Sequence, residues 1–290
     1  MRNLLLDGLV ALNRPEQFLL LENAIDVFTA SPSVTQLLVR GSLATGTADR
    51  LSNVDFVVGV ADDDYIDFVS VLDALMMAEL HAIMPGWRDT GAGDMGGLGY
   101  VYLVACQERL RQLDIYVVPE SALDHNVISA LPVFTRADTD VSLPSHDAMA
   151  FIARTIAEPR TCGELLIEFM VRGFLIGKRV MRRQRFAAYR ETHMFNAAVK
   201  NLIKVALAPD SRDYGWDNLH TDIGATPIGK RCLADLDALL SGPAVPTIES
   251  LDQNIARALA LAERAAPEAV EALRKPIDAY LEYLELLRPL

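Results

Sequence analysis

Short apolar runs alternate with helical stripes along the first half of the chain. The continuous runs predict buried strands, and they lie at 37–39, 54–60, 100–104 and 113–118. Between them, apolar residues recur at the 3.6-residue spacing of an amphipathic helix over 18–28 and over 66–80. A glycine-rich segment at 85–99 predicts a long loop at the rim of a site, or an ordinary exposed loop. Strands mixed with helices predict an α+β domain.

From about Pro144 to the end, the pattern is helical throughout. The predicted helices lie at 162–183, 192–207, 229–240, 247–265 and 267–287. Prolines in the connections separate several of them. We therefore expect two domains, with residues 1–144 forming the α+β domain and residues 145–290 an all-α bundle.

The stretch from Leu37 to Val58 carries the strongest chemical signal. A strand ends at Arg40, the small residues Gly41 and Ser42 follow, and the next strand contains one acid, Asp55. Glycine lets a ligand approach the backbone closely, and the Ser42 hydroxyl and the N–H groups after it can bind phosphate. We expect Asp55 to stand beside this turn and to carry a metal ion.

A second acid, Asp114, interrupts the apolar run at 113–118. A lone carboxylate in a buried strand is costly unless it is paired. A metal ion shared with Asp55 would relieve that cost, and a structural aspartate paired within the core is the alternative.

The order of these pieces resembles the nucleotidyltransferase superfamily, which has the polymerase-beta-like fold. Its signature is Gly-Ser, a spacer of about ten residues, Ser-Asp-x-Asp and a later apolar-Asp-apolar strand. The matching residues are Gly41-Ser42, Ser52-Asn53-Val54-Asp55 and Leu113-Asp114-Ile115. With Arg40 before the Gly-Ser pair, the chain is similar to the aminoglycoside and lincosamide adenylyltransferases. The resemblance implies a mixed central sheet flanked by helices, followed by an all-α helical bundle.

The resemblance also implies an activity, the transfer of AMP from ATP to a hydroxyl of a small acceptor, with Mg²⁺ as cofactor. An aminoglycoside-like molecule is one candidate for this acceptor. Asp55 would bridge two metal ions, and Asp114 would hold the ion nearest the acceptor. Arg40, Gly41 and Ser42 would form the nucleotide-binding turn. A resistance role and a biosynthetic role both stay open.

A basic segment from Lys178 to Arg190 contains six basic residues and no acid. It has two interpretations. Basic side chains are stabilised by the helix dipole at the C-terminal end of a helix, so the segment could be a solvated helix end. The resemblance instead makes Lys178 and Arg182, which are spaced i, i+4, a clamp on phosphate oxygens.

One position departs from the signature, because Asn53 stands where the family has the first aspartate of its pair. An amide keeps an oxygen ligand but loses a negative charge that Mg²⁺ prefers. The metal site could be weakened, Asp49 could substitute, or the protein could bind a nucleotide, small molecule or protein partner without efficient turnover.

Glu108, six residues before Asp114 at a predicted hairpin turn, is a weaker candidate for a general base, with a solvated turn residue as the alternative. Acidic loops at 89–94 and 213–222 suit a cationic acceptor.

The composition sets outer limits on function. A net charge of −12 and a pI of about 4.9 argue against a general nucleic-acid binder. The three cysteines have no metal-binding spacing, and no apolar stretch is long enough for a signal segment or a membrane span. We expect a cytoplasmic protein with no membrane partner, whose oligomeric state is open. A structural helical protein with a chance Gly-Ser motif is the third alternative.

Overall fold

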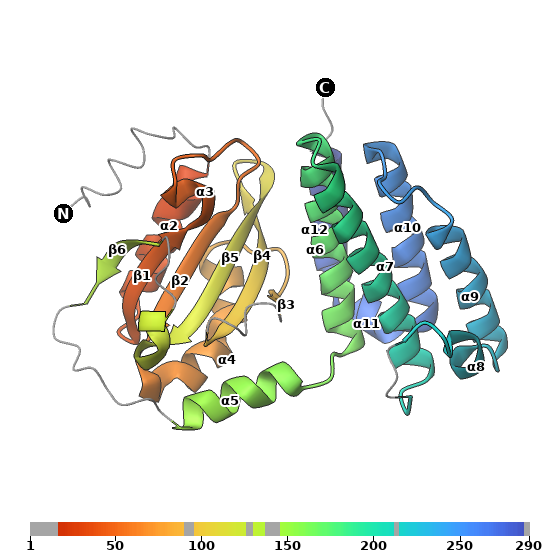
Figure 1. Ribbon diagram of the computed structural model, residues 1–290, viewed down its shortest axis with the longest axis horizontal. Helices are drawn as coiled ribbons and strands as arrows, with labels where there is room; N and C mark the ends of the chain where they lie inside the picture. The colour runs from red at the N-terminus through yellow and green to blue at the C-terminus, as the bar shows by residue number, and fades with distance from the viewer. Residues whose placement is uncertain (1–16, 90–95, 126–129, 137–145, 212–214, 287–290) are drawn as a thin grey trace. The chain divides into compact units, whose positions relative to one another are not determined.

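The computed structural model describes residues 17–89, 96–125, 130–136, 146–211 and 215–286. The chain divides into two compact units, Met1–Glu158 and Pro159–Leu290 (Figure 1). The first unit contains a six-stranded mixed sheet flanked by helices, and the second contains only helices in its described part. This arrangement confirms the predicted α+β architecture with a helical C-terminal half.

The sheet has the strand order β3-β4-β5-β2-β1-β6. The strands are β1 (Val34–Arg40), β2 (Val54–Val60), β3 (Trp87–Asp89), β4 (Leu98–Cys106), β5 (Arg109–Pro119) and β6 (Leu131–Thr135). β2 and β5 pair in parallel, and every other neighbouring pair is antiparallel. The parallel pair brings together two strands that are more than fifty residues apart in the sequence.

Helices cover one face of this sheet. They are α2 (Phe18–Ala30) and α4 (Tyr65–Glu79), and α5 (His146–Ala157) packs against α4 (Figure 1). α2 buries Leu21, Ala24 and Phe28 against the strands, because these residues lie on one side of the helix. The principal core of the unit fills the space between the helices and this face.

The other face of the sheet is apolar at one end and polar at the other. Leu38, Val57 and Val118 form a small cluster with Leu123, which comes from η3 (Glu120–His125). Towards the other end, the same face carries Arg40 on β1, Asp55 on β2 and Asp114 on β5. The candidate site lies at this polar end.

The boundary between the units falls later than the expected one at 144/145, which lies in residues 137–145 outside the described part. We expected α5 to begin the helical domain, yet it belongs to the first unit. Its residues Ala148 and Ile152 pack into the core of the sheet unit. Arg88 of β3 also donates a hydrogen bond to the Thr155 carbonyl. Packing into the core of the first unit, which helical periodicity does not reveal, decides where the helix belongs.

The second unit contains α6 to α12. Their bounds are α6 (Cys162–Met181), α7 (Arg185–Leu207), α8 (Leu219–Ile223), α9 (Pro227–Leu240), α10 (Ile248–Ala265), α11 (Pro267–Ala272) and α12 (Arg274–Leu286). Thr161 and Glu164 form a capping box that starts α6. The single helix expected at 267–287 is interrupted at Leu273. Among the described residues, no helix is long and apolar enough to cross a membrane.

The glycine-rich segment also differs from expectation. Residues 85–99 were expected to form a loop, but Trp87–Asp89 pairs with β4 as an edge strand. The central part of the segment, 90–95, lies outside the described residues.

Candidate functional site

Asp55 and Asp114 are register partners across the parallel pair of β2 and β5. Neighbouring strands lie about 4.8 Å apart, and partners in register point to the same face. Asp114 is buried at 8% exposure, whereas Asp55 is partly exposed. The fold therefore brings together the two carboxylates that the sequence singled out.

Gly41 lies against this pair. Its φ is +67°, a left-handed conformation that favours glycine. A Cβ atom at this position would lie 2.2 Å from Asp55 Oδ2, so the carboxylate occupies the space that any side chain would need. The sequence predicts that a ligand approaches the backbone at Gly41, but the nearest group is the Asp55 carboxylate of the neighbouring strand.

Ser42 belongs to α3 (Gly41–Ala44), a single helical turn that follows β1. Its carbonyl accepts a hydrogen bond of 2.9 Å from the Thr47 N–H, which forms a turn after α3. Arg40 is the register partner of Asp55 on β1, and its guanidinium lies 5.5 Å from the centre of the Tyr116 ring. Arg40, Gly41 and Ser42 therefore all come from the turn next to the carboxylate pair.

Asn53, the departure from the signature, contacts both acids. Its Nδ2 donates to Asp55 Oδ1 at 2.7 Å and to Asp114 Oδ2 at 2.7 Å. Asn53 precedes Asp55 by two residues, so the two side chains share a face of the strand. The amide group bridges the carboxylates in the position where two negative charges meet.

Gln112 was not singled out by the sequence reasoning. Its Nε2 donates to Asp114 Oδ1 at 2.7 Å and to Asp114 Oδ2 at 2.9 Å. Gln112 is buried at 7% exposure. The signal that could have identified it is its spacing, because it precedes Asp114 by two residues as Asn53 precedes Asp55.

Tyr116 reports the electrostatics of this face. Its pKa is raised above the usual value, first by burial and then by the negative charges of Asp114, Asp55 and Asp89. Asp89 pairs in register with Gly99, which in turn pairs with Tyr116. Asp89 is thus a third acid on this face, and it lies on the edge strand β3, whereas the sequence places it in an acidic loop at 89–94.

Glu108 is not brought to the carboxylate pair. It lies with Gln107 in the tight turn between β4 and β5, and both residues have positive φ. Six residues of extended strand separate Glu108 from Asp114, which corresponds to about 20 Å. The geometry therefore favours the alternative interpretation of Glu108 as an exposed turn residue.

Asp49, a possible substitute for the missing acid, takes part in its own turn. Its Oδ1 accepts hydrogen bonds from the Leu51 N–H at 2.9 Å and the Ser52 hydroxyl at 3.2 Å. These contacts shape the connection into β2.

Lys178 and Arg182 lie at the C-terminal end of α6 in the second unit. Lys178 is buried, and its Nζ lies 5.8 Å from the centre of the Phe174 ring. The Arg182 N–H donates to the Lys178 carbonyl at 3.1 Å, which ends the helix. Their role as a phosphate clamp remains a proposal.

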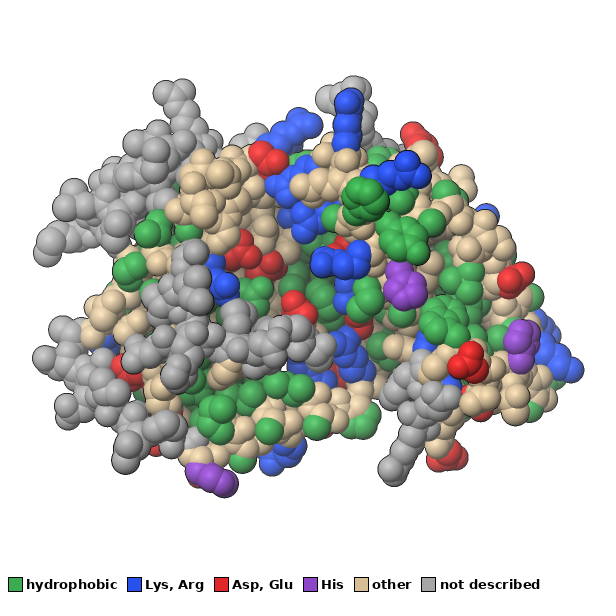
Figure 2. Space-filling view, viewed as in Figure 1, with side chains coloured by type: hydrophobic (Ala, Val, Ile, Leu, Met, Phe, Trp, Pro, Cys, Tyr) green, Lys and Arg blue, Asp and Glu red, His purple; other side chains and the backbone are tan. Residues whose placement is uncertain are grey.

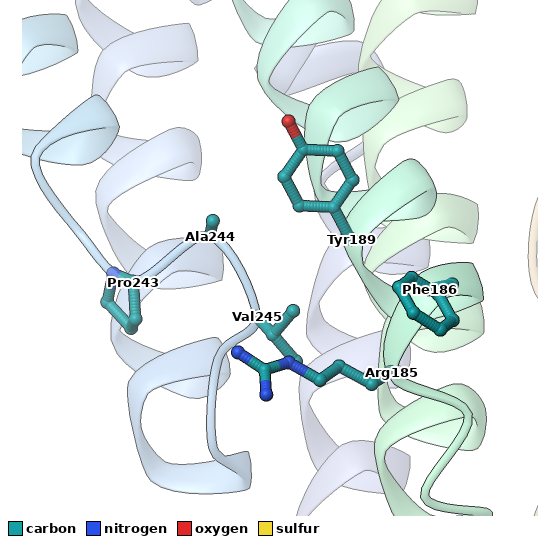
Figure 3. A pocket seen from close by; sticks show the side chains of 6 residues that line it. All are labelled: Arg185, Phe186, Tyr189, Pro243, Ala244 and Val245. Atoms are coloured by element: carbon teal, nitrogen blue, oxygen red, sulfur yellow. The ribbon is translucent and has the colours of Figure 1, made fainter.

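The basic segment continues into α7, and blue side chains gather where α6 turns into α7 (Figure 2). Beside it is a hollow of about 530 Å³. Its walls are Arg185, Phe186 and Tyr189 of α7 and the loop residues Pro243, Ala244 and Val245 (Figure 3). Phe186 and Tyr189 are 90% and 56% exposed, so this is an open aromatic surface within the helical unit.

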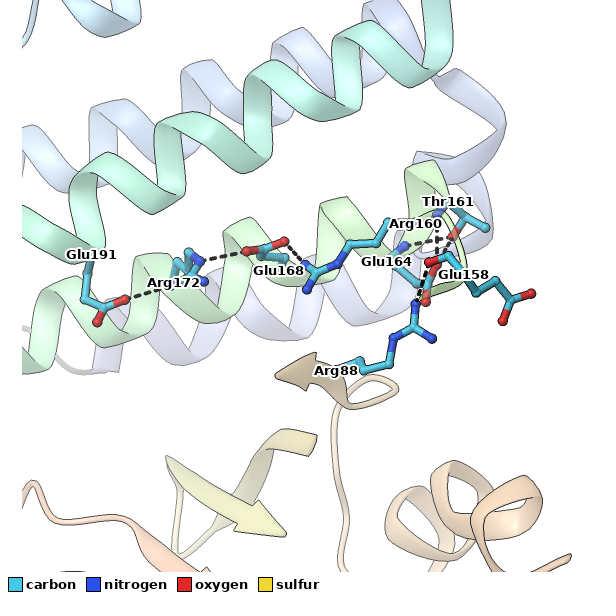
Figure 4. Close-up of polar contacts among 8 residues, drawn as sticks. All are labelled: Arg88, Glu158, Arg160, Thr161, Glu164, Glu168, Arg172 and Glu191. Carbon is cyan, nitrogen blue, oxygen red and sulfur yellow. Dashed lines mark hydrogen bonds and ion pairs between the residues drawn. The ribbon is translucent and has the colours of Figure 1, made fainter. Parts of the chain in front are cut away.

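A chain of buried ion pairs joins α6 to α7 (Figure 4). Glu168 Oε1 lies 2.9 Å from Arg172 Nε, and Arg172 Nη1 lies 2.9 Å from Glu191 Oε2. Arg160 and Arg190 extend the chain at its two ends. Because each buried charge has an opposite partner, we interpret this network as structural.

The chemistry of the donor set bears on the implied metal ion. Within the described ranges, no group of three or more His, Cys, Asp or Glu side chains could hold a metal ion. Asp55 and Asp114 still supply the one or two carboxylates through which Mg²⁺ usually binds together with substrate phosphates. If its amide turned over, Asn53 would present a neutral oxygen. The residues therefore fit a cation that also depends on oxygens from a substrate.

Comparisons with known proteins find similarity among solved structures. No protein-family profile matches the chain, and no curated protein matches it. A structure of a nucleotidyltransferase-like protein from Exiguobacterium sibiricum 255-15 is 14% identical, and the match covers 90% of this chain and 77% of that one. The TM-score is 0.22, so this likeness carries no functional argument.

Proposed function

We propose that the protein catalyses nucleotidyl transfer from a nucleoside triphosphate to a hydroxyl group of a small acceptor. The observation that carries the proposal is the register pairing of Asp55 with Asp114 beside Gly41. Two carboxylates on neighbouring strands, next to a turn of small residues, can hold a divalent cation beside the phosphates of a nucleotide.

In this reaction, the acceptor hydroxyl oxygen attacks the α-phosphorus of the triphosphate. The bond from that phosphorus to the oxygen bridging to the β-phosphate breaks, pyrophosphate leaves, and the hydroxyl proton passes to a base. A divalent cation supplies charge neutralisation and makes the hydroxyl easier to deprotonate. Asp55 and Asp114 would hold that cation.

The other roles follow from placement and from the sequence resemblance. Arg40 and Ser42 belong to the turn beside the pair, where they can contact phosphate oxygens. Lys178 and Arg182 are proposed as further phosphate contacts, ATP as the donor, and Mg²⁺ as the ion. Asp89 adds negative charge to the same face, which suits a cationic acceptor such as an aminoglycoside-like amine.

A second candidate function is nucleotide binding without efficient turnover. The observation that favours it is the contact of Asn53 Nδ2 with both carboxylates, because a donor then faces the oxygens that would ligate a cation. In this alternative the protein would bind a nucleotide, a small molecule or a protein partner.

A pyrophosphate-release assay with ATP and Mg²⁺ across hydroxylated amines tests the proposal. The matched variants are Asp55→Asn and Asp114→Asn, which change the charge and keep the shape. Release that depends on an acceptor and on both acids supports transfer. ATP binding in a calorimeter without release under any condition supports the binding protein. The absence of both ATP binding and pyrophosphate release contradicts nucleotidyl transfer and nucleotide binding alike.

A further inference from the structure

The two strands of the parallel pair carry the same short pattern, an amide residue two positions before an aspartate. Asn53 directly precedes β2, which contains Asp55, and β5 contains both Gln112 and Asp114. Because Val54 is in register with Leu113, the amides of Asn53 and Gln112 form one row beside the row of carboxylates. The result is an array of two amides facing two acids.

In each hydrogen bond of this array, an amide nitrogen donates to a carboxylate oxygen. Asn53 reaches both acids, and Gln112 reaches both oxygens of Asp114. Two adjacent carboxylates repel each other, and most strongly where one of them is buried. Hydrogen bonds to the ionised form offset that repulsion.

A divalent cation would perform the same neutralisation at the same oxygens. The amide donors and a cation therefore compete for Asp55 and Asp114. Gln112 is the stronger competitor at Asp114, because both oxygens of that carboxylate already receive its amide. A cation has to weaken those contacts before it gains full access to the acid.

We propose that Asn53 and Gln112 form an amide clamp that holds Asp55 and Asp114 together without a cation, and that Gln112 is a positioning residue that lowers the affinity for divalent cations. The inference rests on the proposed function in that it takes the same carboxylate pair as the cation site. It adds the prediction that free cations bind weakly and that substrate phosphates supply the missing ligands.

The test uses the full chain, with Mn²⁺ as the probe and no nucleotide present. Gln112→Met keeps the length and burial of the side chain and removes the donor. We expect this variant to melt at a lower temperature without cation and to bind Mn²⁺ about tenfold more tightly, the effect of losing one competing hydrogen bond to a charged group. Mn²⁺ should also raise its melting temperature more than that of the wild type.

Two further variants keep the outcome decisive. Gln112→Glu replaces the donor with a third carboxylate, and it should also bind Mn²⁺ more tightly than the wild type, even if Gln112→Met fails to fold. Gln253→Met makes the same chemical change at an exposed site on α10. It should leave the melting temperature and the Mn²⁺ affinity unchanged.

A merely structural Gln112 would lower the melting temperature and leave Mn²⁺ affinity unchanged or weaker, and that result overturns the proposal. The absence of Mn²⁺ binding by the wild type and by both Gln112 variants overturns it as well. Because the titration contains no ATP and no acceptor, these outcomes are independent of whether the protein catalyses transfer.

Discussion

A Cβ atom on Gly41 would lie 2.2 Å from the carboxylate oxygen Oδ2 of Asp55. Gly41 and the Asp55 carboxylate therefore pack closely, and a side chain at position 41 would displace the carboxylate. The strand register that places Asp55 beside Asp114 then extends this fit across the sheet.

Gly41→Ala should destabilise the protein and disturb Asp55 at the same time. The chain offers a matched control in Gly46, whose φ is +72° and whose Cβ would meet nothing within 4 Å. Gly46→Ala should lower the free energy of unfolding by about 1 kcal/mol, because alanine is strained in a left-handed conformation. Gly41→Ala should lower the free energy of unfolding by about twice that or more, because the Asp55 carboxylate must also move. Denaturant unfolding of both variants measures the difference, and equal costs would show that the contact with Asp55 has no effect.

Asn53→Asp should separate the two candidate functions. A third carboxylate replaces a donor that bridges two acids, so stability without cation should fall by about 1–3 kcal/mol. Mg²⁺ should restore the loss, and Mg²⁺-dependent AMP transfer should increase. A gain in stability with Mg²⁺ but no gain in transfer, with ATP binding intact, would favour the binding protein. Asp49→Asn is the control, since the turn contacts of Asp49 predict no effect on cation binding.

The ion-pair chain in the helical unit should be sensitive to the loss of its central cation. Arg172→Met leaves Glu168 and Glu191 buried without their shared partner, which should cost about 3–5 kcal/mol. Arg274→Met, which removes an arginine paired with acids at an exposed site, should remain near wild-type stability. Thermal unfolding of the two variants compares them directly. A cost for Arg172→Met as small as that of Arg274→Met would contradict the structural interpretation of the network.

Buried tyrosines should make the protein unstable in strong alkali. Burial raises the pKa of Tyr280, whose hydroxyl donates to the Met170 carbonyl at 2.7 Å, and it also raises the pKa of Tyr65. A raised folded-state pKa means that the unfolded chain loses its proton first, so stability is complete below pH about 10 and falls above it. Unfolding free energies between pH 8 and pH 11 should show this decline, and Tyr280→Phe should make it shallower. A decline that is as steep in the variant as in the wild type would exclude Tyr280 as a source.

The sequence predicted Asp55 and Asp114 because each is a single acid within an apolar run, a costly arrangement that needs a reason. The sequence does not single out Gln112, because burying an uncharged amide at the start of an apolar run costs much less than burying a charged carboxylate. Its importance depends on strand register, which becomes visible only when β2 and β5 are paired. The sequence places Asp89 in an acidic loop and not on an edge strand, because the glycines that follow it indicate a loop.

The fold shows the same division between local and long-range information. Periodicity predicted most of the strands and helices because burial on one face is a local property of the sequence. It assigned α5 to the wrong unit, since the partner of an amphipathic face is a long-range property. Ala148 and Ile152 suit a helical bundle as well as they suit the sheet core in which they lie.

The most direct test of the account is to locate a divalent cation in crystals of the full chain grown with Mn²⁺ and an ATP analogue whose α–β bridge cannot be cleaved. The account predicts an anomalous peak within about 2.2 Å of oxygens from both Asp55 and Asp114, completed by oxygens of the analogue. A peak that touches neither carboxylate, or a bound analogue with no ion at the pair, would contradict it.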